Sequence, residues 1–332
     1  MSSLITSTID FDKDGIQHGY LQLLHSVHRS AYGFIPIPIA SIKNGEGPTV
    51  LLMSGNHGDE YEGQVILSEM IRTLPLDEVS GQLIFLPMAN FPAAEAGLRT
   101  SPLDQGNLNR SFPGSENGTP TQQIAHYIEH TLLERADYLF DLHSGGSSLF
   151  YTPTLLISLY GDDPHLAIKK QVQKAFGLPF TLYFERDEIG GFSSAAAFRK
   201  GVCSILTELA GGGTVSRGLP DIAGAGLIRS LNTIGVLRSA PPPSDIISRS
   251  FAEEGSVFAS EPGVYEPLAD PGEDIKAGQP AALIHQVETP GRDPVRLFFE
   301  TDGVILAKRQ PARVLRGDCL FHLGHGEIQT ED

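Results

Sequence analysis

The sequence predicts an α/β fold, built on a mainly parallel mixed sheet with helices on both faces, that is followed by a β-rich region. Candidate strands and helices alternate over about 190 residues from Val50, which is the pattern of a parallel sheet with helical crossovers. This pattern stops at a triple proline, residues 241–243, a stiff segment typical of a linker. We therefore predict an α/β domain over residues 1–240 and a β-rich capping domain over residues 244–332.

The first elements of the α/β domain are strands separated by turn residues. The run FIPIPIASI (34–42) is typical of a strand, and its two prolines favour a place at the edge of the sheet. A buried strand follows at 50–53, after which apolar residues recur at nearly helical spacing over 65–74. The run LIFLP (83–87) predicts the next strand.

A long segment without periodicity, residues 88–118, comes next and is rich in Pro, Gly and Asn. Such segments are uncommon inside compact domains and are usually functional or disordered. Aromatic and apolar side chains along it predict that it is ordered. Thr119 followed by Pro120 then predicts the start of a helix, which we expect to end near Arg135.

The rest of the α/β domain continues the alternation. We expect strands at 136–146, 154–160 and 201–213, and helices at 164–176 and 219–237. Gly177 is placed to end the first of these helices.

The β-rich region carries a rough internal repeat. Segments 261–284 and 301–323 each contain a strand, a Gly-centred turn and a second strand, which resembles the barrel-sandwich fold of biotinyl and lipoyl carriers. No lysine stands at a tight hairpin tip, where the modification of a carrier requires one, so a carrier role is not expected. We interpret the region as a cap.

Charge and composition exclude several classes of partner. The formal net charge is −16 and no basic run occurs, which argues against a nucleic-acid partner. No apolar run approaches the ~20 residues that span a bilayer, and the polar, acidic start has no signal core, so we expect a soluble cytoplasmic protein without a membrane partner. Cys203 and Cys319 form no disulfide framework, although one bridge or two free thiols remain open, as does a homo-oligomer.

His57 and Glu60 lie where the strand at 50–53 passes into a helix, three residues apart on a Gly-flanked turn. Side chains at this separation converge if the turn is helix-like. An imidazole and a carboxylate are two of the three ligands of a catalytic zinc site of the two-histidine, one-glutamate type. The pair alone is a weak signal, and a solvated loop is the alternative.

Three predicted strands end next to a chemically useful residue, namely His57, His143 and Glu208. In open parallel sheets, ligands bind beyond the carboxyl ends of the strands. His143 supplies the missing nitrogen ligand of a zinc site. Asp141, two residues earlier on the same side of its strand, is placed to hydrogen-bond a ligand imidazole; a local polar pair at a strand end is the alternative.

Hydrolysis needs a base as well as a metal. A catalytic zinc keeps one position for water and lowers its pKa to about 7, and a carboxylate outside the ligand set can take the proton of that water. Glu208, which precedes a glycine cluster at 211–213, is the predicted base, with a turn cap as the alternative. Glu62 is the weaker candidate because acidic residues are favoured at helix starts in any case.

The long segment at 88–118 contains Arg99 and the pair Asn109-Arg110. Arginine binds carboxylates bidentately and stabilises developing oxyanions, so these residues are candidates for substrate binding. The alternative is that they hold the segment in place through surface ion pairs.

The motifs GNHGDEYEG, NLNRSFPG, DLHSGG and TELAGGG, in that order, resemble the succinylglutamate desuccinylase/aspartoacylase family of the zinc carboxypeptidase superfamily. The resemblance covers roughly residues 45–325 and implies the zinc carboxypeptidase-like fold. It also implies one zinc ion per chain, held by His57, Glu60 and His143, with Glu208 as general base.

The same resemblance implies that Arg99 polarises the scissile carbonyl and that Asn109 with Arg110 binds a substrate carboxylate. SPLDQGNLNRSFPG and DLHSGG are most similar to the branch that deacetylates N-α-acetyl-2,4-diaminobutyrate. The Ser-Gly-Gly after His143 departs from the Asn-Thr-Thr type of pattern of aspartoacylases, which argues against an aspartate-specific substrate.

These observations predict a zinc-dependent amidohydrolase that removes a small acyl group from an N-acyl amino acid, with a small molecule as its partner. Two alternatives stay open at this point. One is a zinc carboxypeptidase that acts on peptides, and the other is a non-catalytic member that binds a metabolite.

Overall fold

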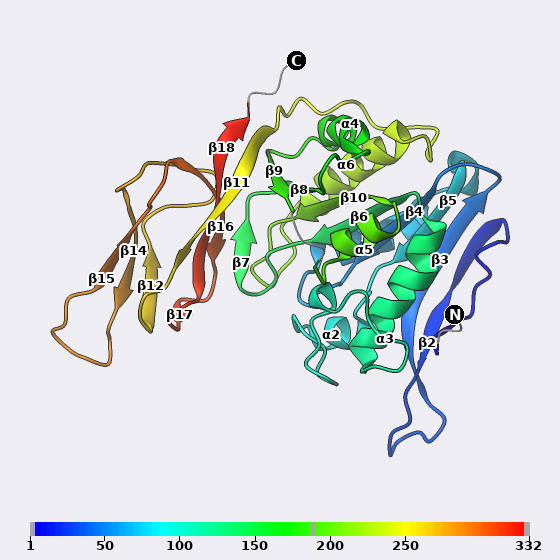
Figure 1. Ribbon diagram of the computed structural model, residues 1–332, viewed down its shortest axis with the longest axis horizontal. Helices are drawn as coiled ribbons and strands as arrows, with labels where there is room; N and C mark the ends of the chain where they lie inside the picture. The colour runs from blue at the N-terminus through cyan, green and yellow to red at the C-terminus, as the bar shows by residue number, and fades with distance from the viewer. Residues whose placement is uncertain (1–3, 187–189, 329–332) are drawn as a thin grey trace.

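The framework of the molecule is a large mixed sheet that runs through most of its length (Figure 1). The computed structural model describes residues 4–186 and 190–328, and within them 14 strands belong to this sheet and 4 to a second one. The centre of the large sheet consists, in spatial order, of β5 (Gly81–Leu86), β4 (Thr49–Ser54), β6 (Tyr138–His143) and β10 (Cys203–Glu208). Neighbours among these four strands run parallel, which confirms the predicted parallel core.

The large sheet continues on both sides of this core with strands of mixed direction. On one side lie β3 (Phe34–Asn44), β2 (Gly15–Leu24) and β1 (Thr6–Ser7), each antiparallel to its neighbours. On the other side β8 (Thr154–Leu159) pairs antiparallel with β10, and β9 (Phe180–Glu185) pairs parallel with β8. The sheet is therefore mixed, as predicted.

The prediction that the proline-containing strand lies at the sheet edge is wrong. This strand, β3, lies between β2 and β5. Its two prolines, Pro36 and Pro38, pair with β2 alone, because β5 joins β3 only from Ala40 onward. A missing N–H is therefore tolerated in the half of the strand that has a single neighbour.

Helices cover both faces of the parallel core, as the sequence predicts. One face carries α1 (Glu62–Thr73), α4 (Leu166–Phe176) and α6 (Leu219–Thr233), and the other α2 (Phe91–Ala96), α3 (Pro120–Tyr127) and α5 (Ser193–Arg199). Alternate residues of β4 enter the two cores, Leu52 on the first face and Leu51 on the second. Within the described ranges, no helix is long and apolar enough to cross a bilayer.

The helix predicted at Thr119-Pro120 begins there. Thr119 and Gln122 form a capping box, and Pro120 occupies the first turn. The helical path continues through a π segment, Ile128–Leu132, and a 3-10 turn, Leu133–Arg135, to the predicted end. Further 3-10 turns occur at Leu76–Glu78 and Leu108–Arg110.

The segment 88–118 is ordered, as predicted, but it contains one helix that the sequence did not reveal. This helix, α2, has six residues, too few for a helical period to show. A proline lies in its first turn, and Gly97 ends it with a φ of 64°.

The β-rich region extends the large sheet instead of standing apart from it. Its first strand, β11 (Arg249–Phe258), pairs with β9 of the α/β part and with β18 (Cys319–Ile328). The sheet then adds β16 (Gly303–Arg309) and β13 (Asp274–Ile275), while β7 (Leu149–Tyr151) pairs with β16. The second sheet contains β15 (Val295–Phe298), β14 (Pro280–His285), β12 (Gly263–Pro267) and β17 (Arg313–Val314). The predicted β-rich region is thus present, and the division into domains at 240 and 244 stays a prediction.

Candidate active site

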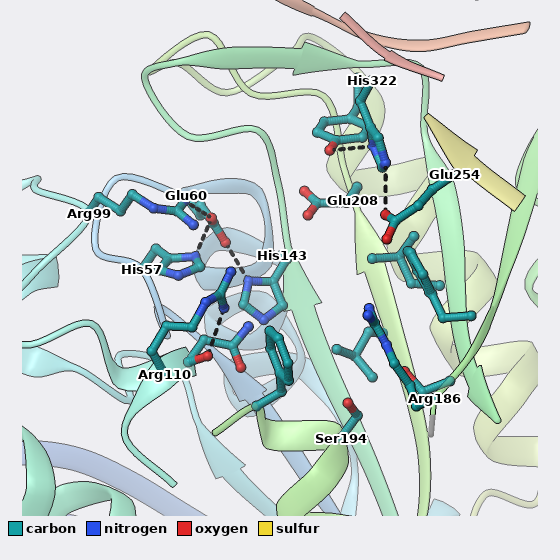
Figure 2. A pocket seen from close by; sticks show the side chains of 17 residues that line it. His57, Glu60, Arg99, Arg110, His143, Arg186, Ser194, Glu208, Glu254 and His322 are labelled. Carbon is teal, nitrogen blue, oxygen red and sulfur yellow. Dashed lines mark hydrogen bonds and ion pairs between the residues drawn. The ribbon is translucent and has the colours of Figure 1, made fainter. Parts of the chain in front are cut away.

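A cavity of about 200 Å³ lies beyond the carboxyl ends of the central strands, next to β11 and β18 (Figure 2). Seven of the eight site residues proposed from the sequence line it, and the eighth, Asp141, lies directly behind His143. The seven are His57, Glu60, Arg99, Asn109, Arg110, His143 and Glu208. The structure therefore brings together residues that are up to about 150 positions apart in the chain, as expected of strand ends in a parallel sheet.

A tight turn after β4 brings His57 and Glu60 together. Gly55 has a φ of +64°, a conformation that suits glycine, and a Cβ at Gly58 would lie 2.1 Å from the backbone of Ala93. The two glycines thus allow the turn to pack closely against α2 before α1 begins. His57 Nδ1 lies 2.6 Å from Glu60 Oε1 as a result.

His143, the last residue of β6, completes the group of candidate ligands. Its Nδ1 lies 2.8 Å from Glu60 Oε2, so the two imidazoles contact opposite oxygens of one carboxylate. The candidate ligand atoms of His57, Glu60 and His143 all lie within 4.8 Å of one another, and all three residues are buried. Such a group can hold a metal ion.

The outer nitrogens of both imidazoles are engaged by acceptors. His143 Nε2 lies 2.9 Å from Asp141 Oδ2, and His57 Nε2 lies 3.2 Å from Asn107 Oδ1. Because these oxygens can only accept, each Nε2 carries a proton, so Nδ1 is the nitrogen of each ring that faces Glu60 and would be the donor atom to a metal ion. Two imidazole lone pairs and a carboxylate oxygen suit a zinc ion, so the residues present fit the metal that the family resemblance implies.

Asp141 is itself held firmly in place. Its Oδ2 accepts hydrogen bonds from Asn56 Nδ2 at 3.0 Å and from Ser193 Oγ at 2.6 Å, and the side chain is fully buried. The sequence predicted this partner of His143 from its position two residues earlier. It did not reveal Asn107, the partner of His57, because no strand or helix spacing links these two residues.

Charge is concentrated at the candidate ligands. Burial alone would raise the pKa of Glu60, but the neighbouring His57 and His143 outweigh it and hold the pKa well below its usual range. Burial opposes protonation of His143, yet Asp141 and Glu60 together raise its pKa well above the ordinary value. The carboxylate is therefore ionised and strongly prefers a positive charge between the rings.

Glu208 ends β10 directly beside His143 in the parallel register. Its buried Oε2 makes no hydrogen bond within the part of the chain that the structure describes. Burial, with Glu60 nearby, raises the pKa of Glu208 well above its usual range. A buried carboxyl group with a raised pKa and an unpaired oxygen is suited to take up and release a proton.

Glu62, the weaker candidate for the base, faces elsewhere. Its Oε1 accepts a hydrogen bond from the backbone N–H of Gly211 at 3.1 Å, and burial raises its pKa. Glu62 does not contribute to the cavity wall. It holds the glycine loop that follows Glu208, in which Gly211, Gly212 and Gly213 all have positive φ.

The arginines from segment 88–118 lie at the cavity wall. Arg99 Nη1 is 3.5 Å from Glu60 Oε1, and the side chain is 46% exposed. Arg110 lies over the ring of Phe192, 4.5 Å from its centroid, and Nη1 donates to the backbone oxygen of Asn109 at 2.7 Å. Burial and the nearby Arg99 and Arg186 lower the pKa of Arg110. An anionic group bound here would relieve this crowding of positive charge.

Several cavity residues were not identified from the sequence, among them Arg186, Glu254, His322 and Tyr151. Arg186 directly follows β9, while Glu254, His322 and Tyr151 lie on β11, β18 and β7. Tyr151 and His322 are separated by 171 positions and meet only because β7 and β18 both pair with β16. No local motif could have connected them.

Comparison with known proteins gives consistent matches. Residues 46–234, more than half of the chain, match the family described as succinylglutamate desuccinylase/aspartoacylase catalytic domain. The chain is 38% identical over 322 residues to the N-alpha-acetyl-L-2,4-diaminobutyric acid deacetylase of Halomonas elongata, covering 96% of this chain and 94% of that protein.

Solved structures agree with this assignment. The product-bound ectoine utilization protein EutE (DoeB) of Ruegeria pomeroyi matches with a TM-score of 0.93 at 37% identity, covering 98% of this chain and 99% of that one. A succinylglutamate desuccinylase of Silicibacter sp. TM1040 matches with a TM-score of 0.92 at 35% identity, covering 99% and 100%. The predicted fold and family resemblance are thereby confirmed.

Proposed function

The chain belongs to the succinylglutamate desuccinylase/aspartoacylase family, and from this premise we propose that it is a zinc-dependent amidohydrolase that deacylates N-acyl amino acids of the N-α-acetyl-2,4-diaminobutyrate type. The observation that carries the proposal is the convergence of His57, Glu60 and His143 beside the buried carboxyl of Glu208. The activities named for the similar proteins, a deacetylase and a desuccinylase, support the reaction class.

His57, Glu60 and His143 would hold the zinc ion, which when bound supplies Lewis-acid polarisation of the acyl carbonyl and a water of lowered pKa. Glu208 takes the proton of the attacking water and returns it to the nitrogen of the departing amine. Arg99, at the cavity wall next to Glu60, stabilises the negative charge that develops on the carbonyl oxygen. Water adds to the amide carbon, the C–N bond breaks, and a carboxylate and an amine leave.

The size of the cavity favours a single amino acid derivative over a peptide. Its volume of about 200 Å³ is below the ~300 Å³ at which pockets for drug-sized ligands begin. Arg110 and Asn109 bind the α-carboxylate of such a substrate, with Arg110 giving a charge-assisted contact. Glu254 of β11 and His322 of β18 also line the cavity. A carboxypeptidase activity is therefore not favoured.

The proposal is tested by an amine-release screen of N-acyl amino acids and peptides, carried out with metal-stripped and zinc-reconstituted protein. We expect release from single N-acyl amino acids with a free α-carboxylate, N-α-acetyl-2,4-diaminobutyrate among them, and only after zinc is restored. Preferred cleavage of peptides would favour the carboxypeptidase reading, and binding without cleavage of any compound would favour the non-catalytic one.

Arg110→Ala is expected to lower kcat/KM by about two to three orders of magnitude for the free-acid substrate. The substrate carboxylate would lose its charged partner inside a partly dry cavity, which costs a few kcal/mol. Steady-state kinetics on the free acid and on its α-amide, with wild type and variant, form a double-mutant cycle.

The kcat/KM for the α-amide should fall little in the variant, because the amide has no carboxylate to pair with the guanidinium group. The substitution and the amidation of the substrate each make the free energy of transition-state binding less favourable. If these two losses simply add when both changes are made, Arg110 does not bind the carboxylate. Arg135→Ala is the matched control, since Arg135 pairs with Asp12 on the surface, 2.8 Å away, and does not line the cavity.

A further inference from the structure

A chain of three hydrogen-bonded side chains lines the side of the cavity formed by the β-rich strands. The Tyr151 hydroxyl lies 2.9 Å from His322 Nδ1, and His322 Nε2 lies 3.2 Å from Glu254 Oε2. Figure 2 shows His322 beside Glu254, with Glu208 nearby. None of the three hydrogen-bonded side chains has a part in the hydrolytic steps proposed above.

The direction of this chain follows from its chemistry. A carboxylate only accepts hydrogen bonds, so His322 Nε2 carries the proton that faces Glu254. In the neutral form of the ring, the Tyr151 hydroxyl donates to Nδ1. Tyr151 is buried, and His322 stands two residues before Gly324, the register partner of Glu254, so the imidazole and the carboxylate share one face of the sheet. The hydrogen bonds from Tyr151 through His322 therefore fix the orientation of the Glu254 carboxylate.

Glu254 keeps binding capacity after this contact. Its Oε1 has no hydrogen-bond partner within residues 4–186 and 190–328, and the side chain is 48% exposed where it lines the cavity. The hydrogen bond from His322 lowers the pKa of Glu254; burial opposes this, and Arg186 adds to it. The cavity thus presents an ionised carboxylate with one oxygen free, away from the candidate metal ligands.

Each charged or polar group of the proposed substrate can now be matched to a part of the cavity. The acyl carbonyl belongs at His57, Glu60, His143 and Arg99, and the α-carboxylate at Arg110 and Asn109. A diamino acid acylated on its α-nitrogen has one further charged group, the side-chain ammonium. Glu254 is the ionised carboxylate of the cavity wall that neither the ligand group nor the proposed base uses.

We infer that Glu254, aimed by His322 and Tyr151, binds the side-chain ammonium of an N-α-acyl diamino acid and sets the specificity of the enzyme for cationic substrates. The inference rests on the proposed function. The ammonium donates to the free carboxylate oxygen in a charge-assisted hydrogen bond. An N-acyl aspartate or glutamate would place a second carboxylate beside Glu254, which repels it, so the same residue excludes acidic substrates.

Arg186 offers a competing explanation of Glu254. Its guanidinium lies 4.6 Å from the ring centroid of Phe184 and 5.4 Å from that of Phe192, and it contributes to the lowered pKa of Glu254. Glu254 would then only position Arg186 for an anionic group. In that case the loss of the carboxylate would affect cationic and neutral substrates equally. The two explanations therefore predict different ratios of kcat/KM between a cationic and a neutral substrate when the carboxylate is removed.

The test compares N-α-acetyl-2,4-diaminobutyrate with N-acetylnorvaline, which carries a methyl group where the first has its ammonium. Wild-type zinc-loaded enzyme should prefer the diamino substrate by at least about tenfold in kcat/KM. Glu254→Gln keeps the shape of the side chain and removes its charge, so it should lower kcat/KM for the diamino substrate about 10- to 100-fold, mainly through KM, and leave N-acetylnorvaline within about twofold. Glu253→Gln, the adjacent carboxylate outside the cavity wall, should change neither.

Equal losses on both substrates, or a wild-type enzyme without preference, would overturn the inference. Calorimetric binding of 2,4-diaminobutyrate and norvaline to the zinc-loaded protein provides an arm that does not depend on turnover. In this measurement we expect Glu254→Gln to weaken the binding of 2,4-diaminobutyrate and to leave the binding of norvaline unchanged. If the ratio of the two affinities is the same in the variant as in the wild type, the inference is overturned. If the wild type cleaves neither acyl substrate, the proposed function fails, and the binding arm still decides the role of Glu254.

Discussion

Glu208→Gln is expected to lower kcat by about two to four orders of magnitude while the protein retains its metal and its KM changes little. Glutamine has the shape of glutamate but cannot take a proton from water, so the variant loses the general base and keeps the cavity. Glu208 lies outside the His57, Glu60 and His143 group, so metal binding should persist. Steady-state kinetics and metal analysis on the same preparations provide the measurement.

Glu62→Gln is the matched comparison for this result. A glutamine at position 62 can still accept the hydrogen bond from Gly211, which is 3.1 Å away in the native protein, so the glycine loop should stay in place. We expect turnover within about tenfold of wild type, because Glu62 does not face the cavity. Near-normal turnover of Glu208→Gln together with a collapse in Glu62→Gln would reverse the assignment.

The sequence was sufficient to predict the parallel core and the group of residues at its edge. Strand β4 is apolar on both faces because it is covered by helices on both sides, and this leaves a run, 50–53, that can be recognised without a structure. His57, His143 and Glu208 each follow or end such a strand. Since parallel strands end at the same edge, their convergence follows from topology alone.

Other features depend on contacts that local sequence does not encode. The place of β3 inside the sheet depends on β5 joining it only past the prolines, which is a matter of register. Asn107 acts on His57 across 50 positions without a periodic signal. Glu254 and His322 reach the cavity because β11 pairs with β9 and β18 at once. Such long-range pairings decide which side chains complete a site.

The same pairings bear on the β-rich region, which we interpreted from its sequence as a cap. β7 pairs with β16 on one side, and Phe150 of β7 forms a bridge with Gly211 on the other. The loop that follows Glu208 is therefore joined to β7, which also pairs with β16 of the β-rich region. The β-rich region therefore contributes side chains to the cavity wall and, through β7, supports the loop after Glu208.

Purified protein reconstituted with zinc is expected to hold close to one ion per chain, and His143→Ala is expected to lose both the metal and the activity. The ligand group offers two imidazoles and one carboxylate, so removing one ligand leaves too few for a catalytic zinc site. Metal content after dialysis and turnover after chelation and zinc addition are the measurements. His285→Ala, at the partly exposed end of β14 and paired with Glu266, is the control and should retain both.

Asp141→Asn keeps the ligand His143 and removes the charged partner that orients its imidazole. The amide can accept the proton of His143 Nε2 only through its oxygen, and it carries no charge to strengthen the ligand, so zinc affinity should fall about 10- to 100-fold while saturating zinc restores turnover. Competition with a chelator of known affinity measures the change. A variant with unaltered zinc affinity would show that Asn56 and Ser193 merely anchor Asp141 as part of the fold. Full activity of the wild type after verified metal removal would contradict the zinc proposal as a whole, whatever the variants do.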